Sequence, residues 1–397
     1  MLVHICCSVD SHYFLSELHK AYPDENLVGF FYNPNIHPKE EHDLRLQDVR
    51  RSCNMLNIKL IEGEYDTQVW FENVRGLEDE PEKGDRCNVC FDTRLVKTAQ
   101  LAKEMQIQKF TTTLLSSPMK EQQVLYKQGD IIAAKNDLEF IKINVRANGG
   151  VNKQNELAKE DRLYRQNYCG CQFALKQQRS KQDKVVFEMI SNVSGQIMPA
   201  SNEYRKLTFN QRDILEKEGK GYVLTQQENL VWRLLLGRVW HKKEVIPSYI
   251  IARSNSKKKA KSSKITWAKP KIESFYQIFQ TQLKDLSNKE KVSFLTQKEE
   301  RYKLDSKLLI GFSQKDDSMF IDINTLNFFF NTDYKNVADM IKNPPKYTQE
   351  MHLRYGLCGM ESMNPIVILD TQIPHDITLE IQSVFQNERN FVVFEEM

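Results

Sequence analysis

Six of the eight cysteines in this chain of 397 residues stand in three close pairs. The pairs are the adjacent Cys6 and Cys7, the CxxC of Cys87 and Cys90, and the CxC of Cys169 and Cys171. Thiolates are soft ligands that favour zinc, copper(I) or an iron–sulfur cluster. One tetrahedral zinc or one cubane cluster uses four thiolates, so six fit a cluster beside a second metal, whereas a structural zinc is the simpler alternative. The pairs predict a metal centre that closes only when three distant segments meet.

Asp10 follows the second cysteine by three residues and is a candidate ligand beside the thiolates. A hard oxygen donor among soft sulfurs suits a metal that also binds a substrate oxygen. The alternative is that Asp10 caps the N-terminus of the next helix. The two remaining cysteines form no pair. We expect Cys53 in the core beneath a helix and Cys358 as an isolated structural residue.

The elements that must position these residues alternate between strand and helix over the first half of the chain. Short apolar runs predict strands at 2–7, 26–33, 58–65, 109–115 and 138–145. Amphipathic stretches predict helices at 11–22, with Ser11 as N-cap, and at 40–57, 91–106 and 153–162. Repeated strand–helix units imply an α/β fold, a parallel sheet with helices on both faces. Ligands of such sheets bind outside the carboxyl ends of the strands, where the first cysteine pair is expected.

The composition changes after residue 184, and the remainder mixes strand-like and helix-like runs. We therefore expect a catalytic domain over 1–184 and a second α+β domain over 185–397. Within the second domain, helices are expected at 229–240 and 272–286. The basic, serine-rich stretch 253–271 is expected to be a mobile linker, which either contacts nucleic-acid phosphates or touches nothing.

Several functional classes are disfavoured by the sequence. The net charge of +3 is nearly balanced, so no global field indicates nucleic-acid binding. No signal peptide and no long apolar run is evident, so a cytoplasmic location is expected, where reduced thiols favour metal ligation over disulfides. The stretch CCSVDS after the first strand contains no glycine. A phosphate-binding loop needs glycines for close backbone approach, so nucleotide hydrolysis is disfavoured.

Six motifs together resemble the epoxyqueuosine reductases of the metal-dependent, cobalamin-free type. They are HICCSVD, FYNPNIHPKEEHDLR, RCNVCFDTRL, TTTLLSSP, NVRANGG and YRQNYCGCQF, in family order over residues 1 to about 180. The family often has Ala-Pro after the paired cysteines and an aromatic residue after the helix glutamates. This chain has Ser8-Val9 and His42 there, and neither departure touches a candidate ligand.

The resemblance implies a fold like that of the ATP-pyrophosphatase group of HUP domains, with a [4Fe-4S] cluster beside a mononuclear iron. It implies reduction of the epoxide of epoxyqueuosine at the wobble position of tRNA, which gives queuosine and water. An external electron donor is then required. The implied metal ligands are Cys6, Cys7, Asp10, Cys87, Cys90, Cys169 and Cys171. We expect the cluster on Cys7, Cys87, Cys90 and one CxC cysteine, and the iron on the others, where Asp10 and Cys6 act in catalysis.

Further residues at strand ends are expected to bind substrate: Tyr32, Asn33, Asn35, Thr112, Ser117 and Arg165, with Thr111 and Thr113 beside them. Arg94, Arg146 and Arg165 are candidates for phosphate contacts. Tyr164 or Tyr168 could stack on a flipped base, although packing beside the metal loop is the better expectation. Two other functions stay open. One is an iron–sulfur tRNA sulfurtransferase, which the missing glycine-rich loop disfavours; the other is a non-catalytic, zinc-stabilised RNA-binding protein.

Overall fold

The structure, a computed structural model, describes residues 1–397 except 191–194, 253–255, 360–361, 374–375 and 397. The chain divides into two compact units. The first contains residues 1–190, 205–225 and 392–397, and the second contains residues 191–204 and 226–391. The first unit thus includes short segments from beyond residue 184. In the described part of the chain, no helix is both long and apolar enough to cross a membrane.

A five-stranded parallel sheet forms the centre of the first unit. Its strands are β1 Leu2–Ile5, β2 Val28–Phe31, β3 Lys59–Glu62, β4 Lys109–Thr112 and β5 Glu139–Phe140. Their order is β3-β2-β1-β4-β5, and every neighbouring pair is parallel. The order reverses between β1 and β4, and ligands of open α/β sheets bind at such a switch point, outside the carboxyl ends. The first cysteine pair directly follows β1 at this point.

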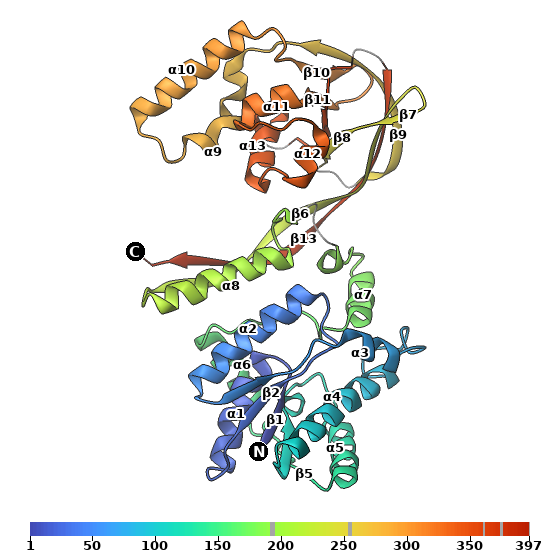
Figure 1. Ribbon diagram of the computed structural model, residues 1–397, viewed down its shortest axis with the longest axis vertical. Coiled ribbons are helices and arrows are strands. Elements are labelled where there is room, and N and C mark those ends of the chain that lie inside the picture. Colours follow the sequence, from blue (N-terminus) through green and yellow to red (C-terminus); the bar gives the residue numbers. More distant parts are fainter. Residues whose placement is uncertain (191–194, 253–255, 360–361, 374–375, 397) are drawn as a thin grey trace. The chain divides into compact units, whose positions relative to one another are not determined.

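Helices cover both faces of this sheet (Figure 1). On one face lie α1 Ser8–Ala21, α2 Lys39–Met55 and α6 Gly150–Glu160, and on the other lie α4 Asp85–Glu104 and α5 Gln122–Asn136. Right-handed crossovers produce this division, because strands added on opposite sides of β1 carry their helices on opposite faces. The other elements are α3 Thr67–Asn73, η1 Thr113–Leu115, α7 Gln172–Lys181, η2 Phe187–Met189 and α8 Asn202–Lys217. The predicted α/β class is confirmed.

Two helix starts lie earlier than the sequence suggested. α1 begins at Ser8 with Cys7 as its N-cap, rather than at Ser11. Asp10 therefore lies within the first turn, and the alternative that Asp10 is the N-cap is wrong. α4 begins at Asp85 rather than near residue 91, so the CxxC motif is helical. The residues added at these two helix starts are mainly polar residues and cysteines, which have weak helix propensity. Tertiary packing extends the helices over these residues.

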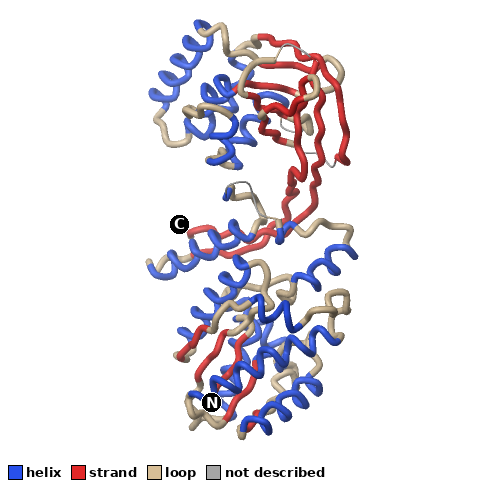
Figure 2. Tube along the Cα trace, turned by 45° about the vertical axis from the view of Figure 1, so that its right-hand side comes forward, coloured by secondary structure: helices blue, strands red, loops and turns tan. Residues whose placement is uncertain are grey.

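The second unit is built on an eight-stranded sheet, in which the long strands β6 and β13 are neighbours (Figure 2). The strands are β6 Tyr222–His241, β7 Glu244–Ile246, β8 Ser248–Ile251, β9 Ser256–Ala268, β10 Ile310–Ser313, β11 Met319–Asp322, β12 Ile366–Leu369 and β13 Asp376–Glu395. The helices are η4 Ile272–Phe279, α9 Gln280–Leu283, α10 Asn288–Leu304, α11 Ile323–Phe330, α12 Val337–Lys342 and α13 Tyr347–Cys358. The predicted α+β character of this region is confirmed.

Two predictions for this region are wrong. The expected helix at 229–240 is part of strand β6, because a short apolar run fits either element and the pairing partner decides. The expected linker at 253–271 is mostly strand β9, which pairs with β13 and β10. Pairing on both sides satisfies the backbone N–H and C=O groups whatever the charge of the side chains. Residues 253–255, and the side chains of 256–263 with their lysines, lie outside the described residues.

Candidate metal centre

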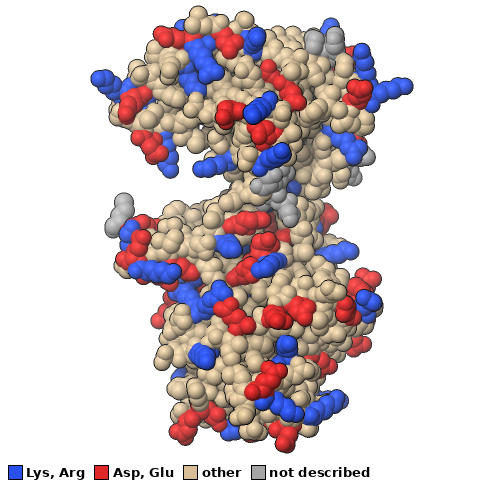
Figure 3. All heavy atoms as spheres, in the orientation of Figure 1, with Lys and Arg blue, Asp and Glu red and all other residues tan. Residues whose placement is uncertain are grey.

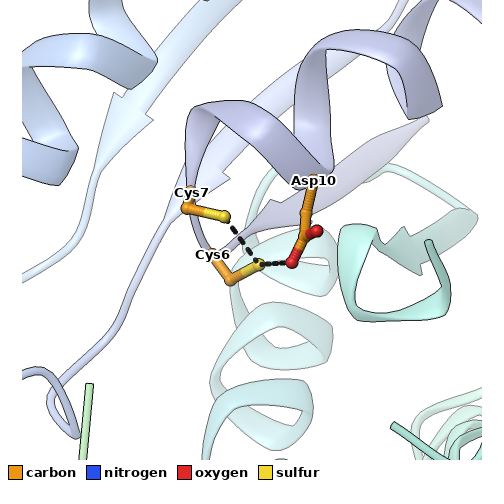
Figure 4. Close-up of side chains that lie close together, drawn as sticks. All are labelled: Cys6, Cys7 and Asp10. Carbon is orange, nitrogen blue, oxygen red and sulfur yellow. Dashed lines mark hydrogen bonds between the residues drawn. The ribbon is translucent and has the colours of Figure 1, made fainter. Parts of the chain in front are cut away.

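Cys6 and Cys7 form the turn from β1 into α1, and Asp10 reaches back toward them from the first turn of the helix (Figure 4). The Sγ atom of Cys6 lies 3.9 Å from the Sγ atom of Cys7 and 3.4 Å from Oδ2 of Asp10. The three potential ligand atoms all lie within 4.8 Å of one another. Three acidic groups at such distances cannot all ionise without a cation between them.

The pKa values of Cys7 and Asp10 also favour a bound cation. The hydrogen bond with Cys6, burial and the charge of Asp10 raise the pKa of the Cys7 thiol well above its usual range. Burial also raises the pKa of Asp10, although Nε2 of Gln154 donates to its Oδ1 at 2.9 Å. Metal ligation requires the deprotonated forms, so a bound cation would remove the penalty that the protein alone imposes on them.

The other two cysteine pairs meet around a second, smaller cavity. Cys87 and Cys90 lie three residues apart in the first two turns of α4, so both side chains lie on one face of the helix. Cys171 is the N-cap of α7. The residues that line this small cavity include Cys87, Cys90, Cys169 and Cys171, together with Asn35, Trp70, Arg86, Arg94 and Lys120. We call this space the four-cysteine cavity.

Arg45 of α2 holds the loop that carries the CxC motif. Its guanidinium donates to the main-chain oxygens of Cys169 and Tyr168, each at 3.0 Å. Gly170, between the two cysteines, has a φ of +118°, and a Cβ atom there would lie 2.9 Å from Ile36. Only glycine adopts this conformation without strain, so the loop depends on both residues.

The anchor of Arg45 is itself buried. Its Nε donates to Oε1 of Glu41 at 2.7 Å, and both side chains are buried. The second carboxylate oxygen of Glu41 accepts from the hydroxyl of Tyr164 at 2.7 Å. The buried carboxylate is therefore paired on both oxygens, which is the condition under which a buried charge is tolerated.

Lys120 places a positive charge beside one cysteine. Its Nζ lies 3.1 Å from Sγ of Cys169 and 3.7 Å from a carboxylate oxygen of Glu82. Burial alone would raise the pKa of the Cys169 thiol, but the charges of Lys120 and Arg94 outweigh burial, and the pKa is lowered. Cys169 is thus biased toward the thiolate, the form that binds metal.

Cys6, Cys7, Asp10 and Cys169 also open into a larger cavity of about 560 Å³. This volume lies in the range of small-molecule sites, so a single nucleobase with its substituent fits. Four of the six expected substrate residues line it: Asn33, Asn35, Ser117 and Arg165. Oδ1 of Asn33 and Oδ1 of Asn35 are buried and accept no hydrogen bond within the described part of the chain. Unpaired buried acceptors are suited to the hydroxyl groups of a ligand.

The other two expected substrate residues do not line this cavity. Tyr32 stacks on Phe30 with ring centroids 5.8 Å apart and faces a separate recess beside Asp66. Oγ1 of Thr112 lies 2.8 Å from Nδ1 of His4 and accepts from the N–H of Leu114 at 3.2 Å. Both residues therefore hold the sheet rather than face the site.

The remaining candidates have mostly internal partners. Arg146 donates to three main-chain oxygens in the turn that follows β4, so it shapes that turn. Arg94 is buried and donates to the carbonyl of Cys90 at 3.0 Å. The hydroxyl of Tyr168 donates to the carbonyl of His37 at 2.5 Å. With Tyr164 bonded to Glu41, both tyrosines are packed beside the metal loop, as expected.

The adjoining threonines are also bonded within the protein. Oγ1 of Thr111 donates to the carbonyl of Ile141 at 2.8 Å. Oγ1 of Thr113 accepts from the N–H of Cys6 at 3.2 Å, so it supports the first cysteine pair directly.

The two unpaired cysteines line neither of the two cavities. Cys53 is completely buried in α2, and burial raises the pKa of its thiol to about 12. Cys358 ends α13 in the second unit, with its sulfur 3.2 Å from the sulfur of Met319. The prediction that Cys53 is a core residue is confirmed.

Comparison with known proteins gives consistent results. The protein-family model described as "Epoxyqueuosine reductase QueH" matches residues 1–177. The chain is 39% identical over 399 residues to "Epoxyqueuosine reductase QueH" of Helicobacter pylori, which covers 98% of this chain and 99% of that protein. The chain belongs to the QueH family. Shorter QueH proteins match only the first half: that of Histophilus somni is 37% identical over 44% of this chain and 72% of its own length. That of Thermotoga maritima is 34% identical over 47% of this chain and 95% of its own length.

The QueH match contains all seven candidate ligands and also the residues that the sequence analysis missed. Those residues are Glu41, Trp70, Arg86, Lys120 and Gln154. Glu41 and Arg45 stand four apart within one of the quoted motifs, and that spacing was the available signal for a helical ion pair. The others are single residues with no spacing signal, and only the fold brings them to the cavities.

Proposed function

We propose that this chain removes the epoxide oxygen of epoxyqueuosine at the wobble position of tRNA and leaves the alkene of queuosine. Both carbon–oxygen bonds of the epoxide break and a carbon–carbon double bond forms. Two electrons and two protons enter, and the oxygen leaves as water. One observation carries the proposal: two thiols and a carboxylate converge at the switch point of a parallel sheet, in the wall of a cavity that fits a nucleobase.

The donor set fits two metal groups. We propose that Cys87, Cys90, Cys169 and Cys171 hold a [4Fe-4S] cluster, because they line one cavity. Cys6, Cys7 and Asp10 would then hold a mononuclear iron, because their ligand atoms lie within 4.8 Å of one another. This division differs from the sequence-based one, which placed Cys7 with the cluster. When bound, the cluster supplies single electrons and the iron polarises the epoxide oxygen as a Lewis acid.

The residues of the chain itself orient the metal ligands and bind the substrate. Gln154 fixes Oδ1 of Asp10 at 2.9 Å, so the other carboxylate oxygen stays directed at the thiols. The unpaired Oδ1 atoms of Asn33 and Asn35 accept hydrogen bonds from the two hydroxyl groups of the cyclopentane ring. A buried amide that loses such a partner is left unsatisfied, so these residues discriminate for the diol.

The rest of the tRNA is held outside the cavity. Arg165 and Lys181 are exposed residues that line the cavity, and both are suited to backbone phosphates. On the face shown in Figure 3, basic and acidic side chains are interspersed, so this face offers no broad basic surface to the tRNA. Binding should weaken as salt rises, with a slope set by the number of phosphate contacts. A tRNA substrate implies a cytoplasmic reaction, and an external donor supplies the electrons.

The experiment is anaerobic purification followed by iron and sulfide analysis and turnover on tRNA that carries epoxyqueuosine. Mass spectrometry of the digested tRNA should show that the modified base loses one oxygen atom. The sulfurtransferase alternative predicts a gain of sulfur instead. A colourless zinc protein that leaves the epoxide intact would contradict the proposal. The Cys53→Ala variant serves as a control, because Cys53 is a buried core residue that lines neither cavity.

A further inference from the structure

Two buried nitrogen donors at the four-cysteine cavity have no hydrogen-bond partner. The side chain of Trp70 is 0% exposed and that of Arg86 is 1% exposed, and both line this cavity. Neither Nε1 of Trp70 nor Nη2 of Arg86 meets an acceptor in the described part of the chain. Buried N–H groups are seldom left unpaired, because an unsatisfied donor is costly. A partner that the protein atoms do not supply is therefore expected at this cavity.

Arg86 is fixed in place by its other terminal nitrogen. Nη1 donates to the carbonyl oxygens of Leu77, Glu78 and Glu80 at 3.3, 2.7 and 2.6 Å. Its guanidinium lies 5.6 Å from the ring centroid of Phe173. Among the described residues, no carboxylate forms an ion pair with Arg86. A buried guanidinium without a counter-charge is unfavourable, so this site favours an anion.

Trp70 is held just as firmly. Its ring packs against His37, Phe71 and Phe173, with centroids 5.1, 5.2 and 5.9 Å away. Trp70, Phe71 and Phe173 belong to one apolar cluster with Cys90 and Cys171. The indole therefore has little freedom to turn its N–H toward another acceptor, and the cavity is the space that remains for a partner.

We propose that Nε1 of Trp70 and Nη2 of Arg86 donate hydrogen bonds to sulfur atoms of the cluster held in the four-cysteine cavity, and thereby raise its reduction potential. This inference rests on the cluster assignment of the proposed function. Four thiolates give such a cluster a net negative charge, which grows by one on reduction. Donors to sulfur stabilise the more negative state, so the potential rises. Lys120, already 3.1 Å from Sγ of Cys169, adds a third donor. The consequence is that a milder external reductant suffices.

The test compares cluster-loaded full-length variants by potentiometric titration monitored by electron paramagnetic resonance. Trp70→Phe removes the N–H and keeps a ring, and Arg86→Met removes the charge. We expect the equilibrium constant for reduction to fall several-fold in Trp70→Phe. In Arg86→Met we expect a fall of about tenfold, which is about 59 mV for a one-electron couple. The control is Arg50→Met, which removes an exposed guanidinium that does not line this cavity, and its potential should stay near that of the wild type.

Iron and sulfide content keeps the two proposals distinguishable. A wild-type protein that holds no cluster would overturn the cofactor assignment. A fully loaded Trp70→Phe protein with the wild-type potential would overturn only the present inference, since the indole would then face a water or another acceptor. If a variant does not take up a cluster, the Trp70 contact is tested in wild-type protein labelled with ¹⁵N-tryptophan. Pulsed resonance of its reduced cluster should show a ¹⁵N coupling, and its absence would count against the Trp70 contact.

Discussion

Both units bury ionisable groups, but those of the first unit lie around cysteine-lined cavities, whereas those of the second unit accompany a core of aromatic and aliphatic side chains. In the first unit, Glu41, Arg45, Arg86 and Lys120 are all buried near the cysteines. In the second unit, the core contains an edge-to-face group of phenyl rings, for example Phe275 against Phe329 at 5.1 Å. Aromatic packing of this kind stabilises a fold and performs no chemistry of its own.

The contrast shows which buried charges accompany the candidate ligands. Buried charges lower stability unless each is fully paired, and proteins keep them where chemistry needs them. The family model stops at residue 177, while the relative from Helicobacter pylori matches 98% of the chain and so includes the second unit. The chemistry is thus assigned to the first unit, and the predictions below test whether the contrast between the units holds.

The largest effect is expected from the proposed ligands. Cys6→Ala, Cys87→Ala and Cys171→Ala should each lose iron and turnover, because each removes a bond to metal. Cys53→Ala and Cys358→Ala should keep both, although Cys53→Ala leaves a small void in the core. Iron content by colorimetric assay and turnover on tRNA measure the outcome. Full activity in any of the three ligand variants would break the assignment.

Replacement of Asp10 should affect the single iron and leave the cluster in place. If Asp10 binds the single iron, Asp10→Ala should abolish turnover and leave the cluster absorbance largely intact. Since Asp10 is not the N-cap of α1, its replacement should have little effect on the thermal unfolding midpoint of the metal-free protein. Loss of the cluster in this variant would place Asp10 at the cluster instead.

Arg45 tests the cost of a buried charge in the first unit. Arg45→Met should lower the free energy of unfolding by about 3–5 kcal/mol, because it leaves Glu41 buried without its cation. The matched control on the same helix is Arg50→Met, whose pair with Glu62 is 50% and 43% exposed. Loss of that exposed pair should cost less than about 1 kcal/mol. Urea unfolding of metal-free protein measures both, and equal effects would contradict the argument.

Lys298 is one of the buried charged residues of the second unit and should give a pH-dependent effect. Its Nζ donates to the carbonyl of Phe328 at 2.6 Å, and burial lowers its pKa to about 8 from 10.5. Between these two values the unfolded chain binds a proton that the folded chain has lost, so stability rises with pH. Relative to Lys298→Met, the wild type should gain up to about 3 kcal/mol across this window. A difference that stays constant with pH would show that the three surrounding phenyl rings keep the ammonium charged.

The smallest effect is expected at Tyr32, whose side chain faces away from the cavity. Tyr32→Phe should change kcat/KM by less than about twofold. Asn33→Ala, one residue later, should raise KM, because it removes an acceptor that lines the cavity. Steady-state kinetics on modified tRNA compare the two. A strong loss of kcat/KM in Tyr32→Phe would show that Tyr32 contacts the substrate.

Much of the first unit could be predicted from the sequence. Its strands are short runs, of which β1, β2 and β4 are almost completely buried, and the strand–helix alternation permits few topologies. The position of Cys6 and Cys7 at a strand end followed from that alternation, and the pairing of the other cysteines followed from their spacing. The second unit was harder to predict from the sequence. The run at 229–240 and residues 256–268 of the basic stretch are strands only because distant strands pair with them.

The sequence by itself determined the α/β class, the set of seven candidate ligands and the resemblance to a reductase family. These depend on residue types and local spacing, which the chain carries along its length. The tertiary structure decided which ligands share a cavity, because that depends on three segments more than seventy residues apart meeting at one end of the sheet. It also decided the roles of Trp70 and Lys120, which no pattern in the sequence marks, and of Arg86, which lies in the quoted motif RCNVCFDTRL without a role assigned to it. The role of a single buried donor depends on the atoms around it, and only the folded chain brings those atoms together.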